Sequence, residues 1–520
     1  MRIDKVHIGN FKNLNKVTVD FDEKSLSTVL IGPNGSGKSN LLEAIAIIFR
    51  NLDLHEDPKF KYTIDYQIRT HRIGIDADPL RERDKTQIVV DSKVVSFRTF
   101  VDHKSDYLPN NVFGYYSGVS KRFQQIFAKH QNQFYTKLIN SVEPPLRPLF
   151  LARTFHGQYV LLAFFALGDE ESVRFLKEYF NITGISSIVF HLKEPYWHMG
   201  KGTKSTDGLF WGAEGVVKNF LYDISKISTW SEKKPHRINL SNKRVRREER
   251  FDLRIKDLQS LQELARQYGK PVQFFKKLES VSISDLIGKL SITVRKEGAD
   301  SSIEFGQLSE GEQQLLVVLG LLKFMNEEES LFLLDEPDTH LNPRWKLGYL
   351  RMIERVVGTN DKSHIIIVTH DPLLIGGLTK SQVQIFSVSK KYSLLIEPPE
   401  VNPIGLGVDG LLTSDIFGLP STLDIKTQEK LDQRIVLIVK KNLVKEKLTD
   451  QEAKVLADLD DYLSKLGFIS TVRDPLYSKF LTALRKYELK EKITFDELER
   501  KAQADIVEKL LLELKAGVKQ

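Results

Sequence analysis

The chain has 520 residues, which is too long for one ordinary hydrophobic core. Hydrophobic residues make up 41% of the chain and charged residues 28%, a composition typical of a soluble folded protein. It contains no cysteine, which excludes disulfides, thiolate metal sites and thiol catalysis. No segment is apolar for long enough to cross a bilayer, and the N-terminus carries no signal-like segment, so we expect a cytoplasmic protein without membrane contact. The net charge of +7 is compatible with nucleic acid as a partner but is weak evidence for one.

The first predicted elements are antiparallel strands. Met1–Ile8 and Lys16–Phe21 alternate apolar and polar residues, which predicts a hairpin. Further alternating runs at Tyr62–Ile68 and Thr86–Val90 predict an antiparallel subdomain beside the N-terminal hairpin.

The segment Gly32–Ser39 follows the apolar run Ser27–Ile31 and fits the phosphate-binding loop pattern. Its glycines allow backbone N–H groups to approach phosphate oxygens. Lys38 can reach the β- and γ-phosphates, and the Ser39 hydroxyl can bind Mg²⁺. We therefore predict ATP and Mg²⁺ as cofactors. The residues predicted to hold the nucleotide here are Asn34, Gly35, Ser36, Gly37, Lys38, Ser39 and Asn40.

The middle of the chain predicts a compact lobe, because it shows neither sustained heptads nor internal repeats. A buried strand at Val112–Gly118 leads into a helix from about Lys121. Within the lobe we expect a strand at Tyr159–Phe165 and helices at Glu170–Phe180 and Gly215–Ile227.

The densest basic stretch is Lys233–Lys256. One interpretation is a solvated loop that enters a charged helix. The other is contact with the phosphate backbone of nucleic acid, which requires clustered Lys and Arg. Phe251 is the one Phe, Tyr or Trp residue in this stretch, so base recognition is not indicated.

Two carboxylates end an apolar strand at Leu331–Pro337. The position suits Asp335 for holding Mg²⁺ and Glu336 for polarising an attacking water. An ion-paired strand end is the structural alternative, which the pattern alone leaves open.

Two further stretches supply polar groups at the ends of buried elements. Ser309 and Gly311 precede an apolar helix, where hydroxyl and N–H groups can meet an anion, although an ordinary N-cap is the alternative. His370 follows the buried strand His364–Val368 and could equally be a structural hydrogen-bonding residue.

In this order, the motifs resemble those of ABC-type ATPases. Gly32–Ser39, Leu308–Glu312, Leu334–Pro337 and Thr369–Asp371 are similar to the Walker A, signature, Walker B and switch-histidine motifs. Asn10–Leu14 resembles the chromosome-maintenance, RecF and OLD branch of that group.

The resemblance implies that two heads sandwich ATP in a homodimer or a larger even-numbered oligomer. Ser309 and Gly311 of one subunit would complete the site built on Lys38 of the other. Glu336 would be the catalytic base and His370 would contact the γ-phosphate.

The sequence departs from the resembled pattern at several positions. Glu310 replaces the first glycine of the signature pair, and Asn342 stands where many relatives have the D-loop aspartate. No Q-loop glutamine is evident, and Tyr116–Gly118 is only a candidate by position. Lys12 could reach the nucleotide, as basic residues do at this place in relatives.

The C-terminal part predicts closure of the ATPase sheet and then helices. Val383–Ser387 and Ser393–Ile396 alternate as strands, and the pattern is helical and charged from Lys426, including Asp450–Leu466 and Phe495–Ala516. We expect no intrinsic nuclease, because the acids that such a domain needs fall elsewhere. Those acids are Glu397, which runs into two prolines, and Asp458, Asp460 and Asp461 in a helical pattern.

Three segments, Val112–Gly118, Asp335–Pro343 and Phe417–Asp424, resemble the ATPase subunit of Septu-type anti-phage systems. That resemblance implies a partner HNH nuclease and, in some versions, a retron with its reverse transcriptase and msDNA. The ATPase would then be slow and regulatory. The alternatives are a RecF- or SMC-like DNA-repair ATPase without a toxic partner and an ATP-sensing scaffold that does not hydrolyse.

The resulting expectation is an α/β fold: an ABC-type P-loop ATPase head with an antiparallel β subdomain, a compact α/β insertion and a helical C-terminal region. The predicted domains are 1–125 and 285–400 for the two halves of the head, 126–284 for the inserted lobe, and 401–520 for a helical region that could dock the partner.

Overall fold

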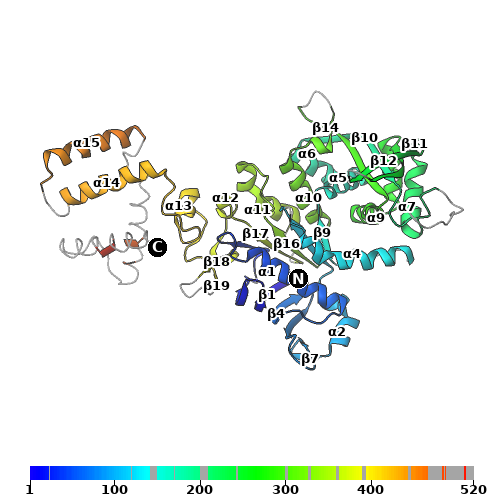
Figure 1. Ribbon diagram of the computed structural model, residues 1–520, viewed down its shortest axis with the longest axis horizontal. Coiled ribbons are helices and arrows are strands. Elements are labelled where there is room, and N and C mark those ends of the chain that lie inside the picture. Colours follow the sequence, from blue (N-terminus) through cyan, green and yellow to red (C-terminus); the bar gives the residue numbers. More distant parts are fainter. Residues whose placement is uncertain are drawn as a thin grey trace. The chain divides into compact units, whose positions relative to one another are not determined.

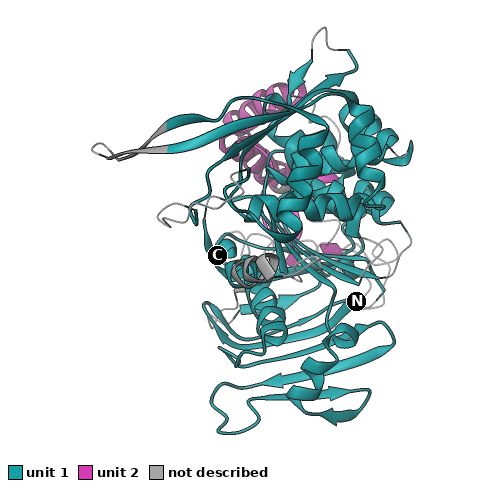
Figure 2. Cartoon of the chain, turned by 90° about the vertical axis from the view of Figure 1, so that its right-hand side faces the viewer, with its two compact units in different colours: residues 1–405 teal, residues 406–520 magenta. Residues whose placement is uncertain are grey.

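The computed structural model describes most of the chain as two compact units, residues 1–405 and 406–520 (Figure 2). The described residues are 1–22, 24–118, 120–140, 149–168, 170–198, 209–241, 244–298, 302–325, 329–358, 362–388, 394–442, 447–466, 483–484, 487 and 509–510.

A seven-stranded sheet lies at the centre of the first unit, as far as the described residues show (Figure 1). Its strands run in the order β19-β18-β3-β17-β16-β8-β9, and every neighbouring pair is parallel except β18 and β19. The bounds are β3 Ser27–Ile31, β8 Asn111–Tyr116, β9 Leu149–Ala152, β16 Ser330–Asp335, β17 Ser363–Val368, β18 Val383–Val388 and β19 Leu394–Glu397. Strands β3, β16 and β17 are buried along their whole length, as expected of parallel strands covered on both faces.

The helices around this sheet carry apolar faces that complete its core. Helix α1 follows the phosphate loop and is buried from Leu41 to Leu52. The other helices and 3₁₀ turns here are α10 Glu310–Met325, α11 Pro343–Val357, α12 Pro372–Ile375, η1 Phe305–Gln307 and η2 Lys380–Gln382, with α1 spanning Lys38–Leu54.

A second sheet is antiparallel and is built from the N-terminal strands, in the order β2-β1-β4-β5-β6-β7. Its strands are β1 Arg2–Phe11, β2 Leu14–Asp20, β4 Tyr62–Ile68, β5 His71–Ala77, β6 Thr86–Val90 and β7 Lys93–Val95, and two short helices follow, α2 Phe97–Asp102 and α3 Lys104–Tyr107. Buried side chains of this sheet and of α1 share one hydrophobic core. The predicted hairpin and antiparallel subdomain are confirmed.

The inserted segment folds as an α/β lobe. Its sheet has the order β11-β13-β10-β14-β15, with β12 paired to β13. The elements are α4 Arg122–Asn140, α5 His156–Leu167, α6 Glu170–Phe180, β10 Ile182–Lys193, α7 Gly215–Lys226, β11 Ser228–Trp230, β12 Lys234–Ser241, β13 Arg244–Ile255, α8 Leu258–Arg266, α9 Pro271–Ile283, β14 Ile287–Lys296 and β15 Ile303–Glu304. The helices predicted at Glu170–Phe180 and Gly215–Ile227 are confirmed.

The strand predicted at Tyr159–Phe165 is wrong, because this segment forms the middle of α5. All seven residues are buried, so the helix is apolar around its circumference and shows no 3.6-residue periodicity. A short apolar run of this kind cannot be assigned to helix or strand by its pattern alone.

The basic stretch Lys233–Lys256 is neither a solvated loop nor a helix, because it forms the hairpin of β12 and β13. Where the structure describes its side chains, some of its cations face partners within the lobe. Arg250 Nε lies 2.7 Å from Glu248 Oε1, and Lys233 Nζ lies 5.1 Å from the Trp211 ring. Phe251 is buried and stacks on Trp230. The side chains of residues 237–247 lie outside the described residues.

The second unit is helical where it is described: α13 Gly407–Thr413, α14 Ile425–Asn442 and α15 Asp450–Lys465. Helix α15 confirms the helix predicted at Asp450–Leu466, and Asp458 and Asp460 lie exposed on it. The helix predicted at Phe495–Ala516 lies outside the described residues, apart from 509–510. None of the helices within the described ranges is both long and apolar enough to span a membrane.

Helix α10 packs closely against α5, and Gly320 of α10 lies where the two helices touch. A Cβ atom on Gly320 would lie 2.2 Å from Val160 Cγ1, whereas one on Gly348 of α11 would meet only the flexible end of Met352 at 3.3 Å. Gly320→Ala should therefore destabilise the chain by about 1–3 kcal/mol, and Gly348→Ala should stabilise it by about 0.5–1 kcal/mol. Thermal unfolding of the two variants checks these opposite signs; equal shifts would contradict the described packing.

Candidate nucleotide site

The phosphate loop connects β3 to α1 and has a backbone that requires glycine. Gly37 caps α1 with φ 106°, in the left-handed region. A Cβ on Gly32 would lie 2.5 Å from the Phe386 carbonyl oxygen, and one on Gly37 would lie 2.8 Å from Asn13 Oδ1. The loop is therefore held tightly by β18 and by the turn between β1 and β2.

Lys38 folds back over the loop that precedes it. Its Nζ donates to the carbonyl oxygens of Gly32 at 2.6 Å and Pro33 at 2.9 Å. Burial lowers the pKa of Lys38, and the nearby carboxylates of Glu336 and Asp335 oppose that shift. The ammonium group is thus pre-positioned inside the loop, where a phosphate could replace the two carbonyl oxygens.

Asn13 fastens the loop from the N-terminal hairpin. Its Nδ2 donates to the Gly35 carbonyl at 2.8 Å, and its Oδ1 accepts from Asn40 Nδ2 at 2.7 Å. The Asn10–Leu14 turn resembles that of the RecF branch, but no role of Asn13 is evident from the sequence. The amide of Asn40 is therefore engaged in holding the loop.

Asp335 ends β16 with its side chain 1% exposed. Burial raises its pKa to about 6, against hydrogen bonding from the Ser39 hydroxyl and the charge of Arg122. Its Oδ1 is buried and, among the described residues, accepts no hydrogen bond. A buried carboxylate oxygen beside a serine hydroxyl is a donor set that suits Mg²⁺, so these residues fit the implied metal.

Glu336 and His370 lie together at the ends of β16 and β17. Glu336 Oε1 is 2.9 Å from His370 Nδ1, and both side chains are at least partly exposed. The Glu336 backbone has φ 52° and its N–H donates to the Val368 carbonyl at 2.8 Å. A non-glycine residue in this conformation carries strain, which its surroundings must hold in place. The carboxylate is thereby aimed where it could accept a proton from water.

The signature segment forms the start of α10 and contacts the loop after β16. A Cβ on Gly311 would lie 2.5 Å from the His340 carbonyl oxygen, so glycine is required here by packing. Ser309 is exposed, and its hydroxyl lies 3.0 Å from Glu312 Oε2 in a capping box. No hydrogen bond joins Ser309 to the phosphate loop within the described part of the chain.

The residues that depart from the resembled pattern have local roles in the structure. The Glu310 carboxylate lies 3.1 Å from His340 Nδ1. Asn342 caps α11, accepting from the Trp345 N–H at 2.9 Å. Ser117, in the segment suggested as a Q-loop by position, accepts from Thr339 Oγ1 at 3.1 Å. Lys12 pairs with the buried Glu43.

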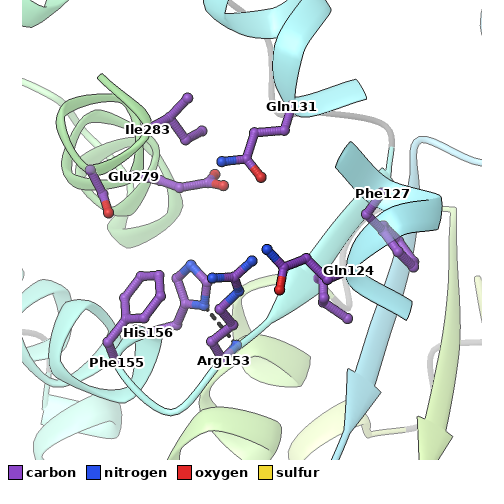
Figure 3. A pocket seen from close by; sticks show the side chains of 10 residues that line it. Gln124, Phe127, Gln131, Arg153, Phe155, His156, Glu279 and Ile283 are labelled. Atoms are coloured by element: carbon purple, nitrogen blue, oxygen red, sulfur yellow. Dashed lines mark hydrogen bonds between the residues drawn. The ribbon is translucent and has the colours of Figure 1, made fainter. Parts of the chain in front are cut away.

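A cavity of about 180 Å³ lies in the lobe, between α4, α5 and α9. Figure 3 shows Arg153 and Gln124 on one side, and Glu279 and Gln131 on the other. No residue predicted for the nucleotide site lines it.

The glycine loop between β3 and α1, with a strand two places along the sheet that ends in acids, defines a P-loop ATPase domain of ABC type. In agreement with this, residues 1–142 match the protein family described as "AAA ATPase domain".

Relatives identified by sequence include a Septu protein, a probable retron ATPase and a DNA replication and repair protein. The chain is 26% identical over 204 residues to "Septu protein PtuA" of Bacillus mycoides (strain KBAB4), covering 38% of this chain and 26% of that protein. It is 23% identical over 448 residues to "Retron Vc95 probable ATPase" of Vibrio cholerae serotype O1 biovar El Tor, covering 78% and 77%. A RecF protein of Picosynechococcus sp. is 33% identical over 86 residues, or 16% of this chain and 17% of that protein. The chain thus matches about a quarter of the Septu protein's length.

Solved structures similar to this chain include "SMC head domain from Thermotoga maritima", with 14% identity and a TM-score of 0.33, covering 77% of this chain and 100% of that one.

Burial of Asp335 makes the stability of the metal-free chain depend on pH. Because the folded pKa is about 6 and the ordinary value is 3.8, the unfolded carboxyl ionises first as pH rises. Stability therefore falls between these values and stays low above them. Asp335→Asn should stabilise the chain by up to about 3 kcal/mol at pH 8 in EDTA, with a smaller gain at pH 5.

Melting temperatures at the two pH values measure this difference. The exposed Asp458 provides a matched control, and Asp458→Asn should leave both melting temperatures unchanged. A gain for Asp335→Asn that is equal at both pH values would show that the buried charge is not its cause.

Proposed function

We propose that this chain is a slow, regulatory ATPase whose heads pair around ATP and which controls a partner HNH nuclease in anti-phage defence. The observation that carries the ATPase part is the convergence of Lys38, the Ser39–Asp335 pair and the Glu336–His370 pair at the same ends of three adjacent strands.

Each group has a part in the proposed hydrolysis. Lys38 and the N–H groups of Asn34, Gly35, Ser36 and Gly37 bind the phosphates, where the N-terminus of α1 also favours negative charge. Ser39 and Asp335 would hold Mg²⁺, which would supply positive charge next to the phosphate oxygens. Glu336 accepts a proton from the attacking water, and His370 orients Glu336 and reaches toward the γ-phosphate.

Pairing of two heads is supported by the position of the signature segment. Ser309 stands exposed at the N-terminus of α10, where its hydroxyl and nearby N–H groups can contact an anion from outside the subunit. Gly311 supports this arrangement indirectly, because it lets α10 lie against the loop after β16. The proposed assembly is a homodimer or a larger even-numbered oligomer.

The nuclease partner rests on the resemblance to Septu-type systems, and a Septu protein is among the relatives. Retron reverse transcriptase and msDNA are further proposed partners, because one match of 448 residues is to a protein named as a probable retron ATPase. The second unit is the proposed docking region, and α14 and α15 expose apolar side chains at Ile425, Val436 and Val455.

The second candidate is a DNA-repair ATPase of RecF type. The match to RecF and the basic hairpin of β12 and β13 favour it. Nucleic acid would then bind along Lys233–Lys256, mainly through phosphate contacts.

Substitutions at the two ends of the site separate nucleotide binding from hydrolysis. Lys38→Ala should abolish binding of ATP. Glu336→Gln should retain ATP but lower kcat by about 100-fold or more, because it removes the proposed general base. Phosphate release and binding of a fluorescent ATP analogue measure the two effects, and wild-type turnover in Glu336→Gln would refute the base assignment.

The same variant tests head pairing. Glu336→Gln with Mg²⁺ and ATP should double in native mass, whereas Glu336→Gln with Ser309→Arg should bind ATP and remain unpaired. Strong stimulation of the wild-type ATPase by DNA, without any nuclease partner, would favour the RecF-type candidate.

Removal of residues 406–520 should abolish copurification with a coexpressed HNH nuclease encoded beside the gene. ATP binding by the truncated chain controls for folding. A truncated chain that binds ATP and still copurifies would show that docking lies elsewhere.

A further inference from the structure

Arg122, the first residue of α4, connects the lobe to both buried acids of the nucleotide site. Its Nη2 lies 3.4 Å from Asp335 Oδ2, and its Nε lies 3.3 Å from Glu43 Oε1. The two carboxylates are 1% and 3% exposed, whereas the arginine is 32% exposed. Neither Arg122 nor Glu43 is predicted from the sequence to be part of the site.

The segment between β8 and α4 holds the guanidinium in this position. Arg122 lies over the ring of Tyr116, 4.9 Å from its centroid, and Tyr116 stacks on Phe123 at 5.4 Å. The Tyr116 ring folds back over Gly118, where a Cβ would lie 2.3 Å from the Tyr116 hydroxyl. The planar guanidinium can stack on the ring and contact both acids at once. The single ammonium group of a lysine could not make all of these contacts.

The charges around Asp335 change when a divalent cation binds there. In the structure, Arg122 and Lys12 pair with Asp335 and Glu43, and Lys38 and Glu336 add one charge of each sign near Asp335. A metal ion at Asp335 would add two positive charges a few ångströms from the guanidinium. Glu43 would then still offer a partner to Arg122, because it carries its own carboxylate outside the proposed metal site.

We propose that Arg122 is a latch that competes with Mg²⁺ for Asp335 and thereby reports metal–nucleotide binding to the lobe. This inference rests on the proposed function, because it requires ATP and Mg²⁺ at this site. Without metal, Arg122 ties the first turn of α4 to β16. When Asp335 takes up a cation, Arg122 releases Asp335 and keeps Glu43, so the first turn of α4 loses its connection to β16.

The lobe leaves room for α4 to respond. Gln124 and Gln131, both on α4, face the cavity of about 180 Å³ shown in Figure 3. A helix that borders a cavity can shift without compressing a close-packed core. The other walls of the cavity come from α5 and α9, so the response would extend to the helices of the lobe.

The competing explanation is a static ion pair that only stabilises the fold. The two explanations predict opposite effects on metal affinity. If Arg122 competes with the metal, its removal tightens metal binding; if it only positions Asp335, its removal weakens metal binding or leaves it unchanged.

The test is a Mg²⁺ titration of the full-length chain with a fluorescent ATP analogue. Arg122→Gln should lower the Mg²⁺ concentration at half-maximal binding by about tenfold, corresponding to loss of one charge-assisted competing bond. Arg122→Lys should lie between Arg122→Gln and wild type. The exposed neighbour Lys121 gives the matched control, and Lys121→Gln should titrate like wild type.

Amide exchange gives a second measurement that does not depend on turnover. In the wild type, exchange of residues 120–131 should rise on adding Mg²⁺ and ATP, and in Arg122→Gln it should already be high without them. The latch proposal is wrong if Arg122→Gln leaves the Mg²⁺ midpoint unchanged or raises it. It is also wrong if amide exchange of residues 120–131 in the wild type does not change when Mg²⁺ and ATP are added. If the wild type binds no ATP analogue while its melting curve shows a folded chain, the proposed function itself fails.

Discussion

The feature on which the rest of the site depends is a carboxylate buried at the end of a parallel strand. Asp335 lies in register with Val368, and Val368 with Leu30. Asp335 therefore stands level with the end of β3, the strand that leads into the phosphate loop. An ionised group at this depth is costly without positive neighbours. Lys38 and Arg122 supply positive charge, and Ser39 supplies a hydroxyl. A bound cation would serve the same purpose more strongly.

The sequence predicts the parts of the site whose physical requirements are local. Turns that require glycine, a lysine within the loop and acids at the end of an apolar strand are each specified within a few residues. The order of these motifs then indicates the fold class, which the parallel sheet and the antiparallel subdomain confirm. Asn13 and Arg122 were missed because their partners lie far away in the chain: Gly35 and Asp335, respectively. Neither residue type is distinctive without those partners.

Errors of the sequence interpretation occur where burial is complete or charge is dense. In α5, Tyr159–Phe165 is buried on every side. A fully buried helix and a fully buried strand both have uninterrupted apolar sequences, so the pattern does not distinguish them. In the β12–β13 hairpin, Arg, Lys and Glu suggest helix by propensity, but pairing of β13 with β10 and β11 makes it part of the lobe's sheet. Tertiary pairing therefore decided this segment against the helix propensity of its charged residues.

Two separate connections lead away from the same acidic strand end. Glu336 follows Asp335, and its carbonyl accepts from Gln314 of α10 at 3.4 Å, while Gln314 Oε1 accepts from the His340 N–H at 3.2 Å. The helix that carries the signature segment is therefore joined to the chain beside the proposed base. Arg122 joins Asp335 itself to the lobe. A change of position or charge at the end of β16 can therefore be transmitted through hydrogen bonds to the surface that is proposed to meet a second head. It can also be transmitted through Arg122 to the lobe. The proposed regulatory function requires such connections.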